Sequence, residues 1–263
     1  MGKCDKEAIL LKEKTASSFG FEWAKFKDIF DSYEANFLSY ISPIDKEFFK
    51  DKLVLDAGCG AGRHSYFAAK YGAKVVAFDL SKEVVRVASG NLKGLNAEVL
   101  QSDMYNFSYP QKFDYIFCIG VLHHLPDPQE GFSKLVSLLK ENGTISIWVY
   151  GKKNNKLAQY IYEPLRKITT LIPHRILYCS VLPIALLVEI TNRLKLPIFS
   201  YYAVFPFKTK WNDAFDVFSA PSAKYYDLHE IEDWFKQAGL RDVKVSYRML
   251  DDTIKGVKGL GIK

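Results

Sequence analysis

Short apolar runs alternate with amphipathic runs between residues 52 and 150. The apolar runs cover residues 52–58, 73–80, 97–103, 113–120 and 144–150. Their length and composition are typical of buried strands. Helical patterns lie between most of these runs; Gly72 would end one helix and Ser81 would cap the start of the next. Alternation of this kind predicts a parallel sheet with helices on both faces.

The alternation stops after Gly151. From there to about residue 218 the chain is aromatic and aliphatic, and five prolines interrupt it. We expect short helices and turns in this part, because proline ends helices. The stretch from 128 to Gly143 predicts a helix that precedes the fifth strand. A capped amphipathic helix over 227–240 and two antiparallel strands joined at Asp251 and Asp252 would complete the chain.

The chain has 263 residues, a formal net charge of +6 and a calculated pI near 8.9. This mild positive charge suits acidic substrates or an anionic surface. No dense Lys/Arg cluster is interleaved with aromatic residues, which argues against a nucleic-acid partner. The four cysteines are far apart, so neither a zinc site nor a disulfide framework is expected. A reduced, cytoplasmic setting fits this cysteine usage best.

One run, residues 176–190, is apolar over nearly its whole length. Pro183 interrupts it and Glu189 stands near its end, whereas a bilayer span takes about 20 apolar residues. We therefore expect no transmembrane helix. Basic residues flank the run, so a helix that lies in a membrane interface is an alternative to a buried lid or a dimer contact.

Three glycines stand directly after the first predicted strand, in the stretch LVLDAGCGAGRHS from Leu53 to Ser65. Ligands of parallel sheets bind beyond the carboxyl ends of the strands, and glycine lets a ligand approach the backbone closely. The spacing does not match a dinucleotide-binding loop, because Arg63 stands where the last glycine would be. The stretch also lacks the Lys-Ser/Thr ending of a P-loop.

The stretch DAGCGAG, from Asp56 to Gly62, resembles the first motif of class I S-adenosylmethionine-dependent methyltransferases. Asp79 in AFDLS, Asp103 in QSDMY and FDYIFCIGVLHHLPDP at 113–128 follow in the order of that family, and the last is similar to the type-11 methyltransferase group. The resemblance is close over 50–150 and looser afterwards. It implies an α/β, Rossmann-like fold whose seven-stranded sheet is mostly parallel, with an antiparallel C-terminal strand pair.

The resemblance also implies an organisation in three parts. Members of the class commonly build acceptor specificity from additions at the N-terminus and after the fifth strand. We therefore expect an N-terminal helical lid at 1–50, a methyltransferase core at 51–150 and 227–263, and a helical insert at 151–226 that covers the acceptor side.

The cofactor implied is S-adenosyl-L-methionine, with S-adenosyl-L-homocysteine as its product. Asp79 would accept hydrogen bonds from both ribose hydroxyls, and Asp103 would accept one from the adenine amino group, with Met104 against the ring. Asp56 would orient the glycine loop or meet the ammonium group through water. The expected cofactor residues are Asp56, Gly58, Cys59, Gly60, Gly62, Asp79, Leu80, Asp103, Met104, Ile119 and Gly120.

His123 and His124 follow the fourth predicted strand, beside the expected position of the cofactor sulfur. A histidine that titrates near neutrality can take a proton from an acceptor, so both are candidate catalytic residues. The alternative is that this segment only packs over the cofactor. Adjacent histidines point apart, and no metal site is expected. The candidate acceptor contacts are Trp23, Arg63, His64, Asp216, Tyr225, Tyr226 and His229.

The expected function is methyl transfer from S-adenosylmethionine to a small-molecule, glycan-type or lipid-linked acceptor, with oxygen favoured over nitrogen and carbon. No Asn-Pro-Pro-Tyr/Phe tetrapeptide follows the fourth strand, which argues against amino methylation of nucleic-acid bases or protein glutamine. One alternative is a cofactor-binding scaffold that docks on a membrane or partner through 176–190. The other is an NAD-dependent oxidoreductase. We expect a cytoplasmic location, with peripheral membrane contact as an option.

Overall fold

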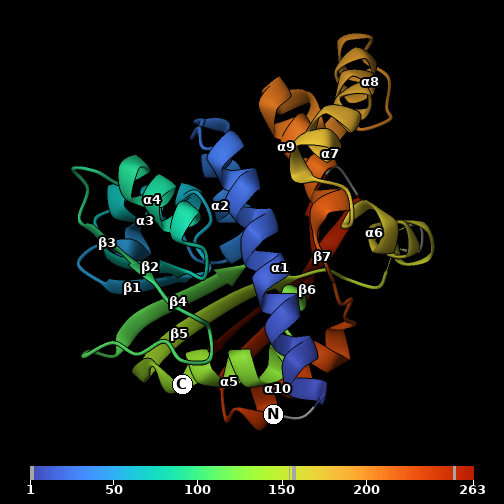
Figure 1. Ribbon diagram of the computed structural model, residues 1–263. Helices are drawn as coiled ribbons and strands as arrows, with labels where there is room; N and C mark the ends of the chain where they lie inside the picture. Colours follow the sequence, from blue (N-terminus) through green and yellow to red (C-terminus); the bar gives the residue numbers. More distant parts are fainter. Residues whose placement is uncertain (1–2, 154, 156–157, 251–252) are drawn as a thin grey trace.

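A seven-stranded sheet forms the centre of the computed structural model, which describes all residues except 1–2, 154, 156–157 and 251–252. The strand order is β3-β2-β1-β4-β5-β7-β6 (Figure 1). The strands are β1 (Leu53–Ala57), β2 (Lys74–Asp79), β3 (Ala97–Gln101), β4 (Phe113–Ile119), β5 (Leu139–Val149), β6 (Arg241–Leu250) and β7 (Thr253–Ile262). Strands β1 to β5 pair in parallel, and β7 pairs antiparallel with both β5 and β6. The expected fold class is confirmed.

Helices cover both faces of the sheet, as the alternating pattern predicts (Figure 1). Helices α2, α3 and α4 share one buried cluster with the sheet, and α5 and α10 share the other. These elements are α2 (Ser32–Ile41), α3 (Arg63–Lys70), α4 (Lys82–Asn91), α5 (Pro128–Ser137) and α10 (Leu228–Gln237). Two short 3-10 helices, η1 (Glu47–Phe49) and η2 (Leu122–His124), complete this part.

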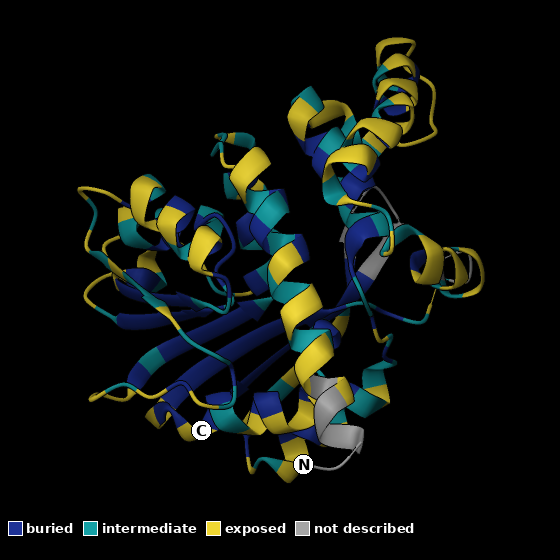
Figure 2. Cartoon of the chain, viewed as in Figure 1, coloured by how far each residue is buried: buried dark blue, intermediate teal, exposed yellow. Residues whose placement is uncertain are grey.

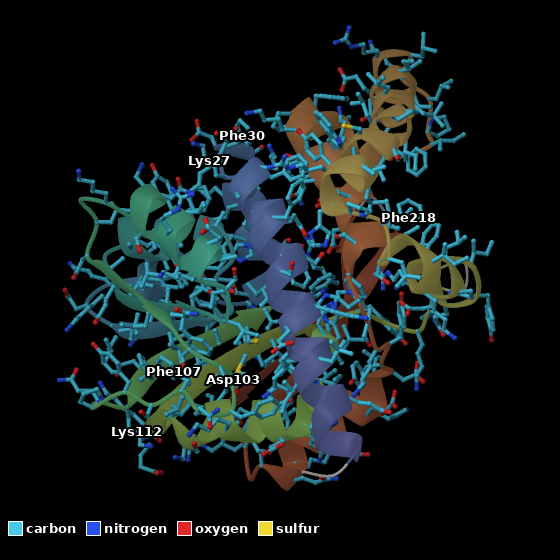
Figure 3. All side chains as sticks on the ribbon, in the orientation of Figure 1. Lys27, Phe30, Asp103, Phe107, Lys112 and Phe218 are labelled. Atoms are coloured by element: carbon cyan, nitrogen blue, oxygen red, sulfur yellow. The ribbon has the colours of Figure 1, made fainter. Side chains whose placement is uncertain are left out.

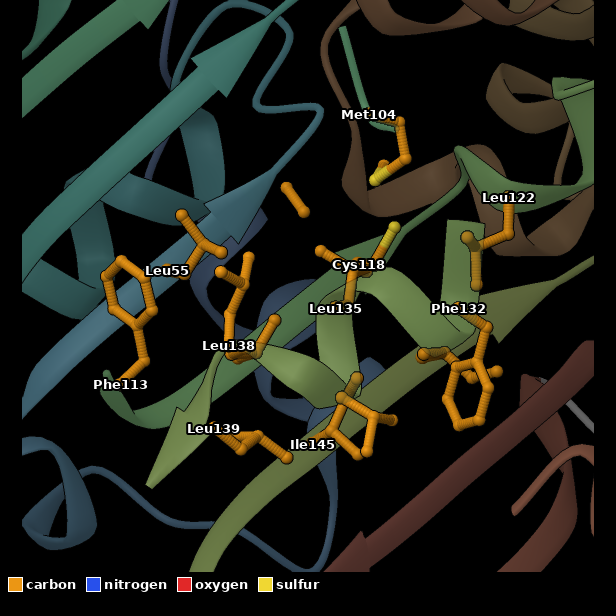
Figure 4. Packing of buried hydrophobic residues seen from close by; sticks show 14 of the residues in the cluster. Leu55, Met104, Phe113, Cys118, Leu122, Phe132, Leu135, Leu138, Leu139 and Ile145 are labelled. Carbon is orange, nitrogen blue, oxygen red and sulfur yellow. The ribbon is translucent and has the colours of Figure 1, made fainter. Parts of the chain in front are cut away.

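Strand β4 shows why the central strands are apolar along their whole length. Successive side chains of a strand point to opposite faces. Tyr115 and Phe117 accordingly join the cluster of α2 and α3, whereas Ile116 and Cys118 join the cluster of α5 and α10. Figure 4 shows the second cluster, in which Phe132 of α5 is one of the buried rings. Because both faces are covered, both sets of positions favour apolar side chains.

Helix α5 ends earlier than the sequence predicts. It stops at Ser137 rather than near Gly143, and β5 already begins at Leu139. Leu139 is buried and pairs with Phe113, so the chain enters the sheet at once. An irregularity follows in β5, where Asn142 has a φ of +63°. The expected turn at Asp251 and Asp252 lies outside the described residues.

Helix α1 (Lys3–Lys25) packs against α4 and α9 and crosses the sheet at the carboxyl ends of its strands (Figure 1). Between β5 and α10 the chain forms a series of short helices. They are η3 (Ala158–Tyr162), α6 (Glu163–Thr169), α7 (His174–Ser180), α8 (Leu182–Arg193), η4 (Ser200–Val204) and α9 (Phe207–Ser219). Helices α7 and α8 project from the body of the molecule, and most of their outer surface is exposed (Figure 2).

The stretch His174–Arg193, which contains α7 and α8, is long and apolar enough to cross a membrane by length and composition alone, and 28% of its most apolar window is buried. The expectation that this region is too short considered only residues 176–190 and is wrong on length. One side of the two helices nevertheless packs on protein. Leu177 and Val181 share a cluster with Phe26 of the segment after α1 and with Phe215 of α9.

Candidate functional site

The loop between β1 and α3 places glycine backbone, which carries no side chains, in the wall of a cavity. Gly58 and Gly60 have φ values of +80° and +53°, which side-chain-bearing residues rarely adopt. A Cβ at Gly58 would lie 2.5 Å from the Val121 side chain, and one at Gly60 would lie 3.0 Å from the ring of Trp23. Both positions therefore require glycine, and both line the cavity together with Cys59.

Asp56 and Gly62 shape this loop from outside the cavity. Asp56 is 2% exposed, and its carboxylate accepts a 2.6 Å hydrogen bond from the Ser65 hydroxyl of α3. Burial raises the pKa of Asp56 to about 7, although the Ser65 bond opposes the rise. Gly62, with a φ of +80°, starts α3 and packs against Leu92. Of the roles expected for Asp56, the geometry supports loop orientation. Gly62, a predicted cofactor residue, does not line the cavity.

Asp79 stands at the end of β2 and faces the same cavity. One carboxylate oxygen accepts the N–H of Gly60 at 3.2 Å, and the other accepts the N–H of Ser81 at 3.1 Å. Burial raises the pKa of Asp79, and these backbone hydrogen bonds oppose the rise. Each oxygen keeps a further lone pair, so the fixed carboxylate can accept two more donors from a ligand.

Asp103 follows β3 and ties helix α1 to the sheet. Its Oδ2 lies 2.9 Å from Nζ of Lys12 in α1, and its Oδ1 accepts the N–H of Tyr105 at 2.9 Å. The Lys12 ammonium also lies 4.4 Å from the centre of the Tyr105 ring. Figure 3 shows Asp103 beside α1 at this end of the sheet. The ion pair holds α1 over the cavity as a lid.

The cavity, of about 170 Å³, lies between this lid and the strand ends. Helix α1 turns one face toward it, with side chains three or four residues apart. These lid residues are Lys12, Thr15, Ala16, Phe19 and Trp23. The opposite wall includes Leu80, Met104, Ile119 and Gly120. Closely approachable backbone, a carboxylate with two free acceptor positions and an apolar strip fit a ligand that combines an amino-acid end, a ribose and a base.

His124 lies where this cavity meets a second one. Its Nδ1 is 2.6 Å from the carbonyl oxygen of Ser222. A carbonyl only accepts, so Nδ1 carries the proton and Nε2 of the neutral ring keeps its lone pair. Burial lowers the pKa of His124, which keeps the ring neutral at physiological pH, although Asp216 opposes this shift. The geometry therefore allows His124 to act as a proton acceptor.

His123 does not share this position. Its side chain is fully buried, stacks on Tyr150 with ring centres 3.9 Å apart and lines neither cavity. Burial lowers the pKa of His123 strongly, so the ring is neutral. The structure therefore places His123 behind His124, with the two ring centres 4.2 Å apart, and outside both cavities, which does not favour the predicted catalytic role for His123.

The second cavity, of about 210 Å³, shares residues of both α1 and the strand ends with the first. Trp23, Arg63 and His64, three of the predicted acceptor contacts, line both cavities. The Arg63 guanidinium lies between the rings of Trp23 and Tyr33, 4.3 Å and 4.7 Å from their centres. Burial lowers the pKa of His64 to about 3, so its ring is neutral. Asp216 completes the expected contacts that the structure places here.

Three other predicted acceptor residues lie elsewhere. Tyr226 is buried against Trp234 of α10, and its backbone pairs with Tyr150. The Tyr225 hydroxyl donates to Glu163 at 3.1 Å, and the His229 side chain is 92% exposed on α10. None of the three lines either cavity. The segment before α10 pairs with the residues that follow β4 and β5, which directs these three side chains away from both cavities and does not favour their predicted contact with the acceptor.

Sequence reasoning missed the lid contacts Lys12 and Thr15, and also most of the second cavity. The spacing of Thr15, Phe19 and Trp23 on one helix face was an available signal. No local signal marks Glu22 of α1 or Asn212 and Asp213 of α9, which meet only in the folded chain.

Residues 54–143 match the protein family described as "Methyltransferase domain". The chain is 30% identical over 161 residues to a ubiquinone biosynthesis O-methyltransferase of Coxiella burnetii, a match that covers 54% of this chain and 65% of the relative. A protein of the same name from Pseudoalteromonas translucida is 28% identical over 170 residues, or 58% of this chain and 71% of that protein. The chain thus spans just under two thirds of the Coxiella relative's length.

Among solved structures, the fold is similar to that of the magnesium protoporphyrin IX methyltransferase of Synechocystis, determined with bound S-adenosylhomocysteine. The TM-score is 0.61, the sequence identity is 15%, and the alignment covers 97% of this chain and 99% of that one. At this identity the likeness concerns the fold.

Proposed function

Since residues 54–143 match a methyltransferase domain, we propose that the chain is a class I S-adenosylmethionine-dependent methyltransferase and that it transfers the methyl group of S-adenosylmethionine to a small-molecule acceptor. The observation that carries this proposal is the cavity under α1, where glycine backbone, Asp79 and Asp103 converge at the strand ends. When bound there, the cofactor supplies an electrophilic methyl group on a sulfonium sulfur. The chain's own residues bind and orient the cofactor and the acceptor, and they exclude water.

The first cavity would hold the cofactor through few, fixed groups. Asp79 would accept from the ribose hydroxyls, since both of its oxygens are oriented by backbone N–H groups. The backbone at Gly58 and Gly60 would lie against the methionine half, and Met104 would pack on the base. Asp103 would accept from the base while its ion pair with Lys12 keeps the lid closed.

The second cavity would hold the acceptor. Ile119, Gly120 and His124 line both cavities, so the methyl group and its acceptor would meet beside them. Such alignment of the reacting groups can contribute about 7–11 kcal/mol to lowering the barrier. Because α9 forms part of this cavity's wall, the insert would contribute to the acceptor site.

We favour a hydroxyl as the acceptor group. A hydroxyl must lose its proton as the new O–CH₃ bond forms and the CH₃–S bond breaks, and Nε2 of His124 is an available lone pair for that proton. The name of the Coxiella relative, an O-methyltransferase, supports the same preference. The acceptor would be a small molecule, a glycan-type molecule or a lipid-linked one. Candidate acceptors of these three kinds can be screened with labelled cofactor.

The direct test is calorimetric titration of the purified protein with S-adenosylhomocysteine, with NADH as the comparison ligand. We expect micromolar binding of S-adenosylhomocysteine and no binding of NADH, because Arg63 stands where a dinucleotide-binding loop has its last glycine. A folded protein that binds NADH but not S-adenosylhomocysteine would overturn the proposal in favour of an oxidoreductase. A folded protein that binds neither would overturn it as well.

A further inference from the structure

Three carboxyl groups gather in the wall of the second cavity. Glu22 comes from the lid helix α1, whereas Asp213 and Asp216 come from α9 in the insert. Glu22 is 1% exposed and its Oε2 has no hydrogen-bond partner. Neither has Oδ1 of Asp216, although its Oδ2 accepts the Tyr150 hydroxyl at 3.1 Å. Unpartnered buried oxygens of this kind are costly, so they point to a donor that binds there.

Two guanidinium groups, Arg63 in the cavity wall and Arg166 behind Asp216, act on these three carboxyl groups and so do not neutralise all of them. Arg63 is the single positively charged side chain among the residues that line this cavity. The other two basic groups, His64 and His124, are neutral because burial lowers the pKa of each. Burial raises the pKa of Glu22 strongly and that of Asp213 to about 6, in spite of the nearby Arg63 guanidinium. A cation in the cavity would allow the carboxyl groups to ionise.

The remaining walls are aromatic, which suits the same kind of ligand. Ring faces attract cations through their quadrupole, most strongly where water is excluded. The rings that line this cavity include Trp23, Tyr33, Tyr40, Trp148, Tyr150 and Tyr201. An apolar acceptor would be held by these rings as well, but it would leave Glu22 and Asp216 without partners.

We propose that the acceptor carries a positively charged amino group, which binds among Glu22, Asp213 and Asp216 while the group to be methylated lies beside His124. The inference rests on the proposed function, because it takes the second cavity to be the acceptor site. Its recognition element, a buried carboxylate cluster within an aromatic enclosure, can be tested separately from cofactor binding and catalysis.

The test compares benzylammonium with benzyl alcohol, a neutral molecule of similar shape, by calorimetry with and without S-adenosylhomocysteine. We expect benzylammonium to bind at least about tenfold more tightly, and Glu22→Gln to remove most of that preference. The affinity for S-adenosylhomocysteine should not change in this variant, because Glu22 does not line the first cavity. Glu13→Gln, at an exposed carboxylate of the same helix, is the matched control.

Equal affinity for the two probes, or binding of neither, would overturn this inference even where S-adenosylhomocysteine binds. A protein that binds benzylammonium selectively but no S-adenosylhomocysteine would support the cation site and contradict the proposed function. The two ideas therefore fail in different ways.

A second inference comes from the outer surface of the insert. Seventeen large hydrophobic side chains are exposed in the described part of the chain, and all of them except Ile9 and Leu10 lie between Tyr160 and Val204. Exposed apolar side chains that gather on one part of a protein mark an interaction surface. On α8 the exposed residues Ile184, Leu187 and Ile190 are three residues apart and share one face, and Figure 2 shows this helix far from the sheet.

Basic residues surround this apolar surface. Between residues 164 and 212 the chain has seven Lys and Arg residues and a single carboxylate, Glu189, which pairs with Lys210 at 2.6 Å and Arg193 at 2.8 Å. Lys167, Arg175 and Lys195 are exposed. An apolar face with a basic border is complementary to a bilayer that contains anionic lipids. It is less suited to a second copy of the same face, since like charges would then meet.

We infer that α7, α8 and the turn after them dock on an anionic membrane surface. Docking in the interface, rather than spanning, follows from the inner side of these helices, where Val181 packs against α9 and Lys210 of α9 pairs with Glu189. Because α9 also lines the second cavity, a docked insert would bring the acceptor site close to the lipid headgroups.

Co-sedimentation with vesicles tests this docking without any cofactor. We expect the protein to bind vesicles of phosphatidylcholine with phosphatidylglycerol at low salt, and to bind phosphatidylcholine alone weakly. Leu187→Glu should abolish binding, and Lys167→Glu with Lys195→Glu should weaken it by about tenfold or more. The controls are Leu10→Glu and Lys93→Glu, at exposed positions outside the insert.

Absence of vesicle binding at low salt would overturn the inference. So would a concentration-dependent dimer in sedimentation velocity that Leu187→Glu abolishes and that vesicles do not dissociate, since the apolar face would then be an interface between two copies of the chain.

Discussion

At the scale of single residues, the orientation of the buried Asp79 carboxylate indicates a role in ligand binding. The N–H groups of Gly60 and Ser81 fix its two oxygens, yet burial raises its pKa, so the ionised carboxylate is not fully compensated by the protein. A ligand with two hydroxyl groups would supply the missing donors.

Asp79→Ala should therefore weaken the binding of S-adenosylhomocysteine by about tenfold or more. A hydrogen bond to a charged group is worth about 1.5–3 kcal/mol, and 1.4 kcal/mol corresponds to about tenfold in affinity. Calorimetric titration of the folded variant measures the change. Glu83→Ala, at an exposed acid in the first turn of α4, should leave the affinity as it is. An unchanged affinity in Asp79→Ala would remove Asp79 from the cofactor site.

His124 gives the second prediction at this scale, and it concerns pH. Burial lowers the pKa of His124, so the neutral, proton-accepting form prevails down to a pH below the usual histidine value and is lost only as the pH falls further. The ring signal that disappears from the NMR spectrum of His124→Ala should titrate below 6.5.

The rate of methyl transfer should show the same pH dependence as the His124 ring, measured with an acceptor that the screen has identified. We expect turnover to fall at the pH at which His124 gains its proton, and His124→Ala to reduce turnover by about a hundredfold or more while cofactor binding persists. Turnover at the wild-type rate in His124→Ala would show that His124 is not the base. A His124 signal that titrates above 6.5 would contradict the assigned tautomer and burial.

The sequence predicted which residues reach the first cavity where these residues are tied to strand ends. Asp79 and Asp103 each follow a parallel strand, so the register of the sheet alone brings them to one edge. The same reasoning failed for Tyr225 and His229, whose positions depend on how the chain returns from the insert. It also could not separate His123 from His124, since the difference lies in how a single 3-10 turn orients two neighbouring rings.

At the scale of elements, helix α1 works as a lid because it packs closely on α4. A Cβ at Gly20 would lie 2.8 Å from the Ser81 hydroxyl and 3.9 Å from Glu83, so glycine sets the distance between the two helices. The sequence predicted a helical lid over residues 1–50. It did not reveal the Lys12–Asp103 ion pair, which joins residues from two separate elements.

Gly20→Leu should push α1 away from α4 and open the first cavity. We expect the affinity for S-adenosylhomocysteine to fall by about tenfold, because Phe19 and Trp23 would lose their places in the cavity wall. The matched control is Gly90→Leu, a helical glycine whose added Cβ would meet nothing within 4 Å. Equal affinities in the two variants would show that the spacing of α1 and α4 does not control the cavity. Retained helical circular dichroism would show that both variants fold.

At the scale of the whole molecule, the insert links three surfaces. Helix α9 lines the second cavity on one side and packs against α7 and α8 on the other, while the outer faces of α7 and α8 meet solvent. The apolar run at 176–190 predicted either a buried cover or an interfacial helix, and the sequence could not decide between them. That choice depends on which side of the helices α9 occupies, a long-range contact that no local pattern encodes.

The first cavity is built jointly by the lid, the glycine loop and the ends of three strands, so its occupation should stabilise the molecule as a whole. A ligand that binds only the folded state adds about 2.7 kcal/mol at a concentration one hundred times its Kd. In a chain of this size each kcal/mol raises the Tm by roughly 2–4 °C. We therefore expect S-adenosylhomocysteine at that concentration to raise the Tm by about 5–10 °C in a thermal melt. Asp79→Ala should show about half of this rise or less at the same ligand concentration, because its larger Kd lowers the occupancy. An equal rise in both proteins, or a rise with NADH of the same size, would mean that the ligand binds outside the cavity under α1.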